Sequence, residues 1–157
     1  MTFDESKHNR DADGKFTPKP HAEGVDVSLE ASTPIRHLLR GGGEMWKLPD
    51  GTLHRDEGPA IVQPDGTQAW FRHGLLHRDD GGPARTLPVK GGRGQALREW
   101  YENGLLHRDG GPAVTQGAFQ AWYRDGKKHR EGGPAVTYTD GREEWWINGK
   151  QQAPPAN

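Results

Sequence analysis

From residue 45 onward, apolar and aromatic residues stand in short runs separated by residues that favour tight turns. Such runs occupy 69–72, 100–102, 135–138 and 144–147. The turn dipeptides are Asp50-Gly51, Asp65-Gly66, His73-Gly74, Asn103-Gly104, Asp125-Gly126, Asp140-Gly141 and Asn148-Gly149. Asn-Gly and Asp-Gly are typical of two-residue hairpins, because a type I′ turn needs positive φ at both central positions. The pattern therefore predicts an antiparallel meander of β-hairpins.

One phrase, His-Arg followed by Gly-Pro-Ala, occurs four times within this pattern. Its copies occupy 51–60, 74–84, 104–113 and 126–135, and a tryptophan precedes each copy. A partial fifth copy at 145–150 keeps the tryptophan and lacks both other parts. Self-similarity of this kind is the signature of a repeat architecture, in which each unit packs on its neighbours. We predict an all-β fold in which 45–150 forms one elongated antiparallel sheet of repeated hairpins.

The repeat period varies along the chain. Successive tryptophans are 24, 30, 22 and 23 positions apart, and the longest interval contains a glycine-rich, locally basic insertion at 88–95. This insertion has two interpretations. It is either a tolerated loop, since added loop length costs little entropy, or a protruding loop that carries function.

The two ends of the chain differ from the repeats in composition. Residues 1–31 are polar and contain few large apolar groups, so they are expected to form a disordered tail. Residues 151–157 include two consecutive prolines and are expected to be a frayed C-terminal tail.

Between the N-terminal tail and the repeats, 32–44 has the pattern of a short helix. Thr33 can cap the helix and Pro34 suits its first position. The apolar residues on one predicted face are Ile35, Leu38 and Leu39. Glycines follow and would end the helix. We predict a short helix and a glycine linker that cap the first edge of the sheet.

Composition narrows the possible functions. The chain has 157 residues, a net charge of −1, 31 % hydrophobic residues and no cysteine. Near-neutral charge argues against a nucleic-acid partner and against a polybasic membrane patch. The lack of cysteine excludes disulfides and thiolate metal sites. Because no apolar run is long enough for a membrane span and no secretory signal is evident, a cytoplasmic protein is expected.

Aromatic doublets follow the turns at regular places. Neighbouring residues on a strand point to opposite faces, so the doublets predict two ladders. The first ladder, to which we assign packing of the sheet, consists of Trp46, Trp70, Trp100, Trp122 and Trp145. The second consists of Phe71, Tyr101, Tyr123 and Trp146. This second ladder either packs as well or forms an exposed platform for a partner.

Every complete copy also carries a His-Arg pair followed by an acid. The pairs are His54-Arg55, His77-Arg78, His107-Arg108 and His129-Arg130. Equivalent residues are expected to lie about 10 Å apart, at ~4.8 Å per strand, so two such histidines could not share one Zn²⁺ and no metal site is expected. We expect the histidines to pack or hydrogen-bond across hairpins and each arginine to pair with a carboxylate. Alternatively, the arginines form a basic row for an acidic or phosphate-bearing partner.

The remaining motifs indicate structure and give no sign of catalysis. In Gly-Pro-Ala, glycine is expected to supply an unusual φ, proline to fix the turn and alanine to pack tightly. The sequence contains no Gly-x-Ser-x-Gly, no His-Glu-x-x-His, no P-loop and no cysteine nucleophile. Four equal His–acid pairs argue against a single catalytic centre. Neither catalytic residues nor a cofactor are therefore expected.

The repeats resemble the MORN-like repeats of bacterial and viral proteins. The segments that carry the resemblance are 70–74, 100–104 and 122–126, where an aromatic doublet leads into a glycine turn, and the match extends over 46–150. The His-Arg and Gly-Pro-Ala elements depart from the usual pattern, so the chain is similar to a sub-type. The stretch 8–16 resembles N-terminal tails that are common in proteins of actinobacteria and their phages.

The resemblance implies stacked hairpins and an interaction role instead of catalysis. Some bacterial members sit in the antitoxin half of toxin–antitoxin pairs, and eukaryotic members have been linked to membranes and phospholipids. The function expected is a non-enzymatic scaffold, bacterial or phage-encoded, that binds another protein through one face of the sheet. The competing hypotheses are an antitoxin or immunity-type protein that neutralises a partner enzyme, phosphate or lipid-headgroup binding by the His-Arg row, and a weak hydrolase in the insertion.

Overall fold

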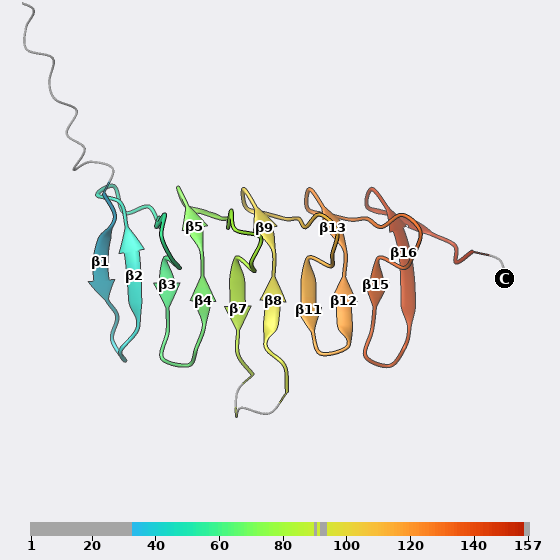
Figure 1. The fold of residues 1–157 in the computed structure, drawn as a ribbon, viewed down its shortest axis with the longest axis horizontal. Helices are drawn as coiled ribbons and strands as arrows, with labels where there is room; N and C mark the ends of the chain where they lie inside the picture. The colour runs from blue at the N-terminus through green and yellow to red at the C-terminus, as the bar shows by residue number, and fades with distance from the viewer. Residues whose placement is uncertain (1–32, 90, 92–93, 156–157) are drawn as a thin grey trace, which may run out of the picture. The chain divides into compact units, whose positions relative to one another are not determined.

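The computed structural model describes residues 33–89, 91 and 94–155, and within them the fold is all β, without a helix. Eleven strands form one sheet in which hydrogen-bonded neighbours run antiparallel (Figure 1). In spatial order they are β1 (Ile35–Leu38), β2 (Glu44–Lys47), β3 (Ile61–Val62), β4 (Gln68–Ala69), β7 (Arg85–Leu87), β8 (Leu97–Glu99), β11 (Val114–Gln116), β12 (Phe119–Ala121), β15 (Val136–Thr137), β16 (Glu143–Ile147) and β17 (Lys150–Gln152). The predicted antiparallel meander is confirmed.

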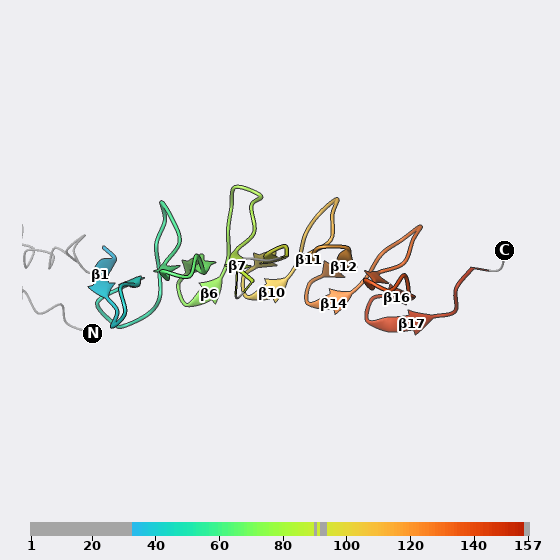
Figure 2. The ribbon, with the colours of Figure 1, turned by 90° about the horizontal axis from the view of Figure 1, so that it is seen from below.

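Three two-stranded hairpins lie outside this sheet. They are β5 (Phe71–Arg72) with β6 (Leu75–Leu76), β9 (Tyr101–Glu102) with β10 (Leu105–Leu106), and β13 (Tyr123–Arg124) with β14 (Lys127–Lys128). Each hairpin and the loop after it connect two neighbouring strands of the large sheet. Figure 2 shows β6, β10 and β14 on one side of the sheet and the loops that follow them on the other side.

The connections between sheet strands are the sequence repeats, and we number them as units. Units 1 to 4 are 46–60, 70–84, 100–113 and 122–135, and the partial unit 5 is 145–150. In unit 1 a single bridge between Lys47 and Leu53 stands where the later units have a hairpin. Units 2 to 4 each begin after one sheet strand and end before the next, whereas units 1 and 5 begin within β2 and β16. Successive units are two sheet strands apart.

The predicted helix within 32–44 is wrong, because Ile35–Leu38 forms the edge strand β1 and pairs along its whole length with β2. The glycines after it make a turn, in which Gly41 and Gly42 have φ of 97° and 93°. A segment this short between a proline and a turn cannot nucleate a helix, whereas pairing with β2 satisfies its backbone groups. Two of the three apolar residues of the predicted helical face are consequently exposed, Ile35 by 52 % and Leu38 by 75 %, and Leu39 is half-buried.

The C-terminal tail begins later than predicted. Strand β16 pairs with β15 through Glu143 and Glu144 and with β17 through its remaining residues, which places Gln151 opposite Trp146 and Gln152 opposite Trp145. This last hairpin occupies the position in unit 5 that β13 and β14 occupy in unit 4. Its turn, at Asn148 and Gly149, has φ of 50° and 76°. The repeated structure therefore extends into the segment predicted to be the tail.

The insertion in the longest repeat leaves the sheet intact. Strands β7 and β8 pair directly, from Arg85 opposite Glu99 to Leu87 opposite Leu97. The insertion emerges from the turn between them, at the opposite end of these strands from units 2 and 3 (Figure 1). Lys90, Gly92 and Arg93 lie outside the described residues, as does the predicted disordered tail. Units therefore keep their separation in space although their separation in sequence varies.

Small residues form the most buried part of the fold. The alanines of Gly-Pro-Ala, each with no exposed surface, are Ala60, Ala84, Ala113 and Ala135. A further cluster of Val114, Ala121 and Val136 is buried near the C-terminal end of the sheet. The tryptophans of the first ladder are half-buried, so the innermost positions belong to alanine and valine.

Successive hairpin turns pack on one another through glycine. A Cβ on Gly104 would lie 3.3 Å from Leu75 Cδ2, and a Cβ on Gly126 would lie 3.4 Å from Leu105 Cδ2. These glycines also have positive φ, of 82° and 73°. Glycine is required at both positions by backbone conformation and by close approach. Leu75 and Leu105 thereby form a row along the hairpins and remain about half exposed.

The carboxylate of Glu144, on β16, makes stability depend on pH. It accepts hydrogen bonds from Lys128 Nζ at 3.0 Å, Tyr138 Oη at 2.8 Å and Trp146 Nε1 at 2.7 Å. These donors, Lys128 foremost, hold the pKa of Glu144 below its usual value of 4.5. A lowered folded-state pKa contributes stability that is present above the usual pKa and is lost as pH falls through the lowered value.

We therefore predict that Glu144→Gln lowers the urea midpoint of unfolding at pH 7 and flattens its dependence on pH below about 4.5. Urea titrations between pH 7 and pH 2.5 measure both effects. The matched control is Glu143→Gln, which removes the neighbouring, exposed carboxylate. Equal pH profiles for the two variants would contradict the assignment.

Candidate binding surface: arginine clamps and inter-unit grooves

Each complete unit holds its arginine against its own tryptophan. The guanidinium carbon lies 3.6 to 4.1 Å from the indole centroid in all four units. The pairs are Arg55 over Trp46, Arg78 over Trp70, Arg108 over Trp100 and Arg130 over Trp122. Cation–π contacts contribute about 0.5 to 2 kcal/mol each, depending on desolvation. These arginines therefore pack inside their units and do not form a free basic row.

The loop of each unit closes over the other face of the guanidinium. Arginine Nη1 donates to the carbonyl of the proline in Gly-Pro-Ala at 3.0 to 3.2 Å. A Cβ on the glycine before that proline would lie 2.5 to 3.1 Å from the guanidinium carbon. The glycines are Gly58, Gly82, Gly111 and Gly133. We call this arrangement of tryptophan, arginine, glycine and proline the arginine clamp.

The role predicted for the glycine of Gly-Pro-Ala is wrong. Its φ lies outside the left-handed region in all four units, and in units 2 to 4 that conformation belongs to the residue before it, Gly81, Gly110 or Gly132. Glycine is needed before proline because the guanidinium occupies the space of a side chain. The alanine after the proline is fully buried, and its carbonyl accepts a hydrogen bond from the backbone N–H of the tryptophan of the same unit at 2.7 to 2.8 Å. The clamp is thus tied into the sheet.

The histidines join each unit to the next. Nδ1 accepts the backbone N–H of the first turn residue of the following unit at 3.1 to 3.2 Å. The donors, in order from His54 to His129, are His73, Asn103, Asp125 and Asn148. In His54, His77 and His129 an accepting Nδ1 places the proton of a neutral ring on Nε2. In all four units Nε2 faces the acid two residues later at 2.6 to 3.7 Å, and Nδ1 of His107 also lies 3.0 Å from Oδ1 of Asp125. In the described residues no group of three or more potential ligands is placed to hold a metal ion.

The expected pairing of arginine with a neighbouring carboxylate is found in unit 2. Arg78 donates from Nε and Nη2 to Asp80 at 2.6 and 2.9 Å. These bonds, with the backbone N–H of Gly82, hold the pKa of Asp80 below its usual value. Asp79 bonds instead to His77 and Arg72. In units 1, 3 and 4 the indole and the proline carbonyl hold the guanidinium, so the clamp does not depend on a carboxylate.

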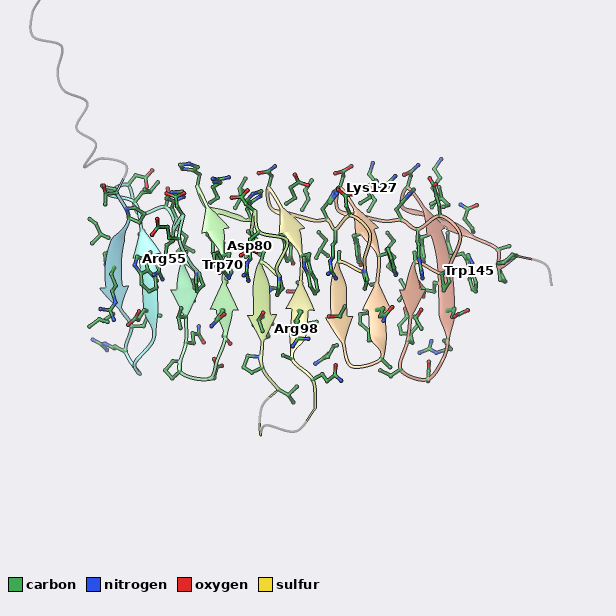
Figure 3. The ribbon with its side chains drawn as sticks, in the orientation of Figure 1. Arg55, Trp70, Asp80, Arg98, Lys127 and Trp145 are labelled. Carbon is green, nitrogen blue, oxygen red and sulfur yellow. The ribbon has the colours of Figure 1, made fainter. Side chains whose placement is uncertain are left out.

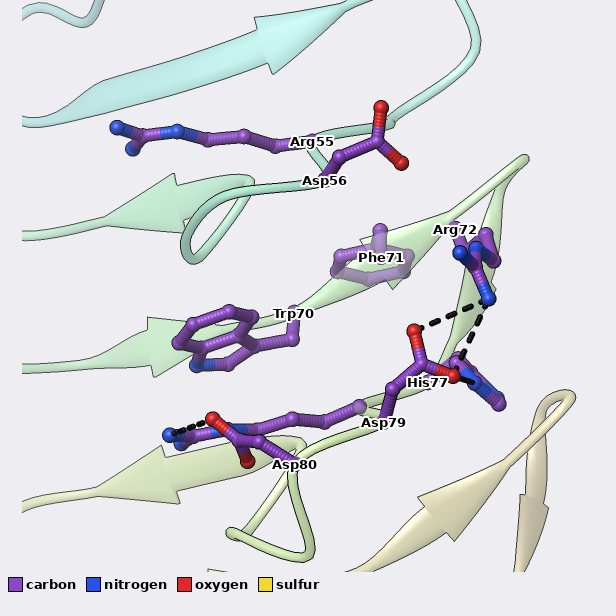
Figure 4. A pocket seen from close by; sticks show the side chains of 9 residues that line it. Arg55, Asp56, Trp70, Phe71, Arg72, His77, Asp79 and Asp80 are labelled. Carbon is purple, nitrogen blue, oxygen red and sulfur yellow. Dashed lines mark hydrogen bonds and ion pairs between the residues drawn. The ribbon is translucent and has the colours of Figure 1, made fainter.

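A groove lies between each unit and the next, and we name the four grooves 1/2, 2/3, 3/4 and 4/5. The earlier unit contributes its arginine, and the later unit contributes its aromatic doublet. Figure 4 shows this for groove 1/2, with Arg55 and Asp56 across from Trp70 and Phe71. In Figure 3, Arg55, Trp70 and Trp145 lie at one level across the strands, away from Arg98 near the turns.

All eight residues predicted to bind a partner line these grooves. They are Arg55 and Phe71 in groove 1/2, Arg78 and Tyr101 in 2/3, Arg108 and Tyr123 in 3/4, and Arg130 and Trp146 in 4/5. The structure thus brings an arginine and an aromatic residue together from successive units. Sequence spacing could not have shown these pairs, because their members lie on different units.

The second aromatic ladder both packs and stays accessible. Tyr123 and Trp146 pack against the buried cluster of valine and alanine. Trp122, the first-ladder neighbour of Tyr123, instead stacks against Arg130. All four members of the ladder are half-buried. Burial raises the pKa of Tyr101 above its usual value. Tyr123 and Trp146 therefore support the fold and also line a groove.

The grooves differ in charge at the position after the aromatic doublet. Groove 1/2 has Arg72, groove 2/3 has Glu102 and groove 3/4 has Arg124. In groove 2/3, Glu102 and Asp109 both face His107 Nε2, at 3.8 and 3.4 Å. Groove 4/5 is lined mainly by apolar and aromatic residues beside one arginine. Among the four, groove 2/3 is therefore the most acidic.

The acids that rim the grooves are functional candidates that sequence reasoning missed. They are Asp56, Asp79, Asp109 and Glu131, one in each complete unit. The signal that could have found them is their constant place after His-Arg. That place suggests ion pairs with arginine, whereas each acid in fact faces the histidine of its own unit.

Comparison with protein-family models, curated proteins and solved structures finds no match to this chain. In the part of the chain that the structure describes, no helix is long and apolar enough to cross a membrane. Function is therefore inferred from the geometry and chemistry of the grooves.

The clamp predicts that Gly82→Ala is destabilising for a reason specific to Arg78. The new Cβ would lie 2.5 Å from Cζ of Arg78, so the guanidinium must shift from its present place against the indole. We expect a loss of about 1 to 3 kcal/mol in the free energy of unfolding, as for overpacking elsewhere. Urea unfolding of Gly82→Ala, Arg78→Ala and the double variant forms a double-mutant cycle. The two changes should be strongly non-additive, because both remove the same contact; simple additivity would refute the clamp.

Proposed function

We propose that this chain is a non-enzymatic repeat scaffold that binds another protein through the face carrying the four grooves. The observation that supports this is the juxtaposition, in every groove, of a half-buried aromatic side chain and a clamped arginine. Aromatic residues and arginine are enriched where protein interfaces are most strongly bound. A guanidinium already fixed by an indole and a carbonyl loses little further entropy on binding.

A phosphate or lipid headgroup fits these grooves less well. The guanidinium faces are covered by indole and glycine, and Nη1 is already bonded to proline. Most exposed charges at the rims are carboxylates, such as Asp56 and Asp109, which repel an anion, and the exposed arginines there are Arg72 in groove 1/2 and Arg124 in groove 3/4. The grooves therefore favour a partner that is not anionic.

A hydrolase centred on the insertion draws no support from the grooves. The insertion emerges from the end of β7 and β8 that is opposite the histidines. A catalytic site made from the insertion and a histidine is therefore not favoured by this arrangement. An antitoxin or immunity role would be one form of the proposed protein binding. The MORN-like resemblance and the bacterial or phage origin stay predictions.

The proposal is tested by affinity capture from a lysate of the native host, followed by calorimetry with the purified captured protein. Tyr101→Ala removes the ring that lines groove 2/3, and we expect at least a tenfold loss of affinity, about 1.4 kcal/mol, as for an interface hot spot. Tyr101→Phe, which keeps the ring, should retain most of the affinity.

The matched control is Leu105→Ala, on the same hairpin as Tyr101. Leu105 is 50 % exposed and lies outside the described lining of all four grooves. Thermal unfolding must show each variant folded at the assay temperature. If Tyr101→Ala binds as tightly as the wild type, or if Leu105→Ala loses as much affinity, the groove face is not the binding surface.

A further inference from the structure

We propose that the partner of the groove face is a proline-rich, basic segment in the polyproline II conformation. The segment would lie across the sheet strands and advance by one helical turn per unit. Its prolines would sit in successive grooves, and basic residues every third position would face the rim acids. This inference rests on the proposed protein-binding function and adds the conformation and chemistry of the bound segment.

The spacing of the grooves carries the argument. Each unit is two sheet strands from the next, at every step from unit 1 to unit 5. Neighbouring strands are about 4.8 Å apart, so the grooves repeat every 9.6 Å or so. A polyproline II helix has three residues per turn and a rise of about 3.1 Å, which gives a repeat of roughly 9.3 Å. Residues i, i+3, i+6 and i+9 can therefore face four successive grooves.

The α-helix and the extended strand do not match this spacing. An extended strand presents the same face every second residue, about 6.7 Å apart, or every fourth, about 13 Å apart. An α-helix returns to the same face after about 5.4 or 10.8 Å, and the longer repeat drifts by about 3.6 Å over three intervals. A polyproline II segment drifts by about 1 Å over the same distance.

The shape of the grooves also suits proline. The clamped arginine lies 3.6 to 4.1 Å from the tryptophan of its own unit, which leaves about 5.6 Å before the next tryptophan, and the clamp glycine already packs against the guanidinium. That gap is too narrow for a flat ring to insert between two layers. A partner side chain must instead rest in the mouth of the groove, against aromatic edges. Proline-rich segments bind aromatic-lined grooves in this way, since their conformation is already formed before binding.

Charge selects a basic segment. In each complete unit the acid two residues after the histidine is exposed and follows the same spacing, with side chains 63 % exposed at Asp56, 64 % at Asp79, 93 % at Asp109 and 79 % at Glu131. Two exposed arginines oppose them, Arg72, which pairs with Asp79, and Arg124 in groove 3/4. Glu102 takes the equivalent place in groove 2/3. Groove 2/3 is therefore the expected anchor for a basic segment.

The test uses two synthetic twelve-residue peptides of equal composition. The in-phase peptide is (Pro-Pro-Lys)₄, and the out-of-phase peptide has lysine at every second position through residue eight, followed by four prolines. Calorimetry or tryptophan fluorescence at 150 mM salt measures Kd. We expect the in-phase peptide to bind at least tenfold more tightly than the out-of-phase peptide. In a series of peptides with two to six Pro-Pro-Lys triplets, affinity should rise up to four triplets, one for each groove, and change little beyond four.

Reciprocal substitutions at equivalent positions provide matched variants. Glu102→Arg installs the residue that two other units carry, so the fold should tolerate it, and it should weaken the in-phase peptide at least tenfold. Arg124→Glu should strengthen binding several-fold. Glu143→Lys, on strand β16 and outside the described groove linings, changes the net charge as Glu102→Arg does and should have little effect.

Each outcome decides the inference. Equal affinity for the two peptides, or equal loss in Glu102→Arg and Glu143→Lys, reduces the binding to net charge and overturns the spacing argument. No measurable binding of either peptide overturns it as well. Neither result touches the proposed function, which stands or falls with the captured partner and Tyr101→Ala.

Discussion

The contact on which the rest of the structure depends is the arginine clamp. A chain with 31 % hydrophobic residues cannot build a thick aliphatic core, and its fully buried side chains are mostly alanines. Each unit instead layers an indole, a guanidinium and a glycine backbone, and closes the layer with a hydrogen bond to proline. The contact is worth a few kcal/mol per unit at most, which is a large share of the marginal stability of a small domain.

Histidine converts these separate clamps into one array. The backbone N–H of His77 donates to Trp70 of its own unit, and its ring accepts from the turn of unit 3, so the unit that holds a clamp also positions the next turn. The glycine at that turn then packs against Leu75. Every unit therefore depends mainly on its nearest neighbours, as expected for a linear repeat, and damage at one clamp should weaken the adjacent units most.

The antiparallel meander could be predicted from the sequence because turn chemistry is local. Dipeptides such as Asn103-Gly104 require positive φ, and the structure has it there. The helix predicted at 32–44 is wrong because helical spacing takes no account of strand β2, which follows directly after the glycine turn and pairs with this segment. The role predicted for the glycine before proline is wrong for a related reason. A side chain is excluded at this glycine because the guanidinium of Arg78, or of the equivalent arginine, lies against it. The sequence alone does not show that this arginine packs against the loop of its own unit.

The grooves could not be predicted, although each of the eight candidate residues lines one, because a groove joins units that are separate in sequence. Their spacing is nevertheless more regular than the sequence period. Units that are 22 to 30 residues apart in sequence are all two sheet strands apart in the structure. The reason is that the insertion between β7 and β8 leaves the sheet at the end opposite the clamps. The surface for a partner is thus insulated from changes in loop length. A ligand with its own fixed period is the kind that such a surface can discriminate.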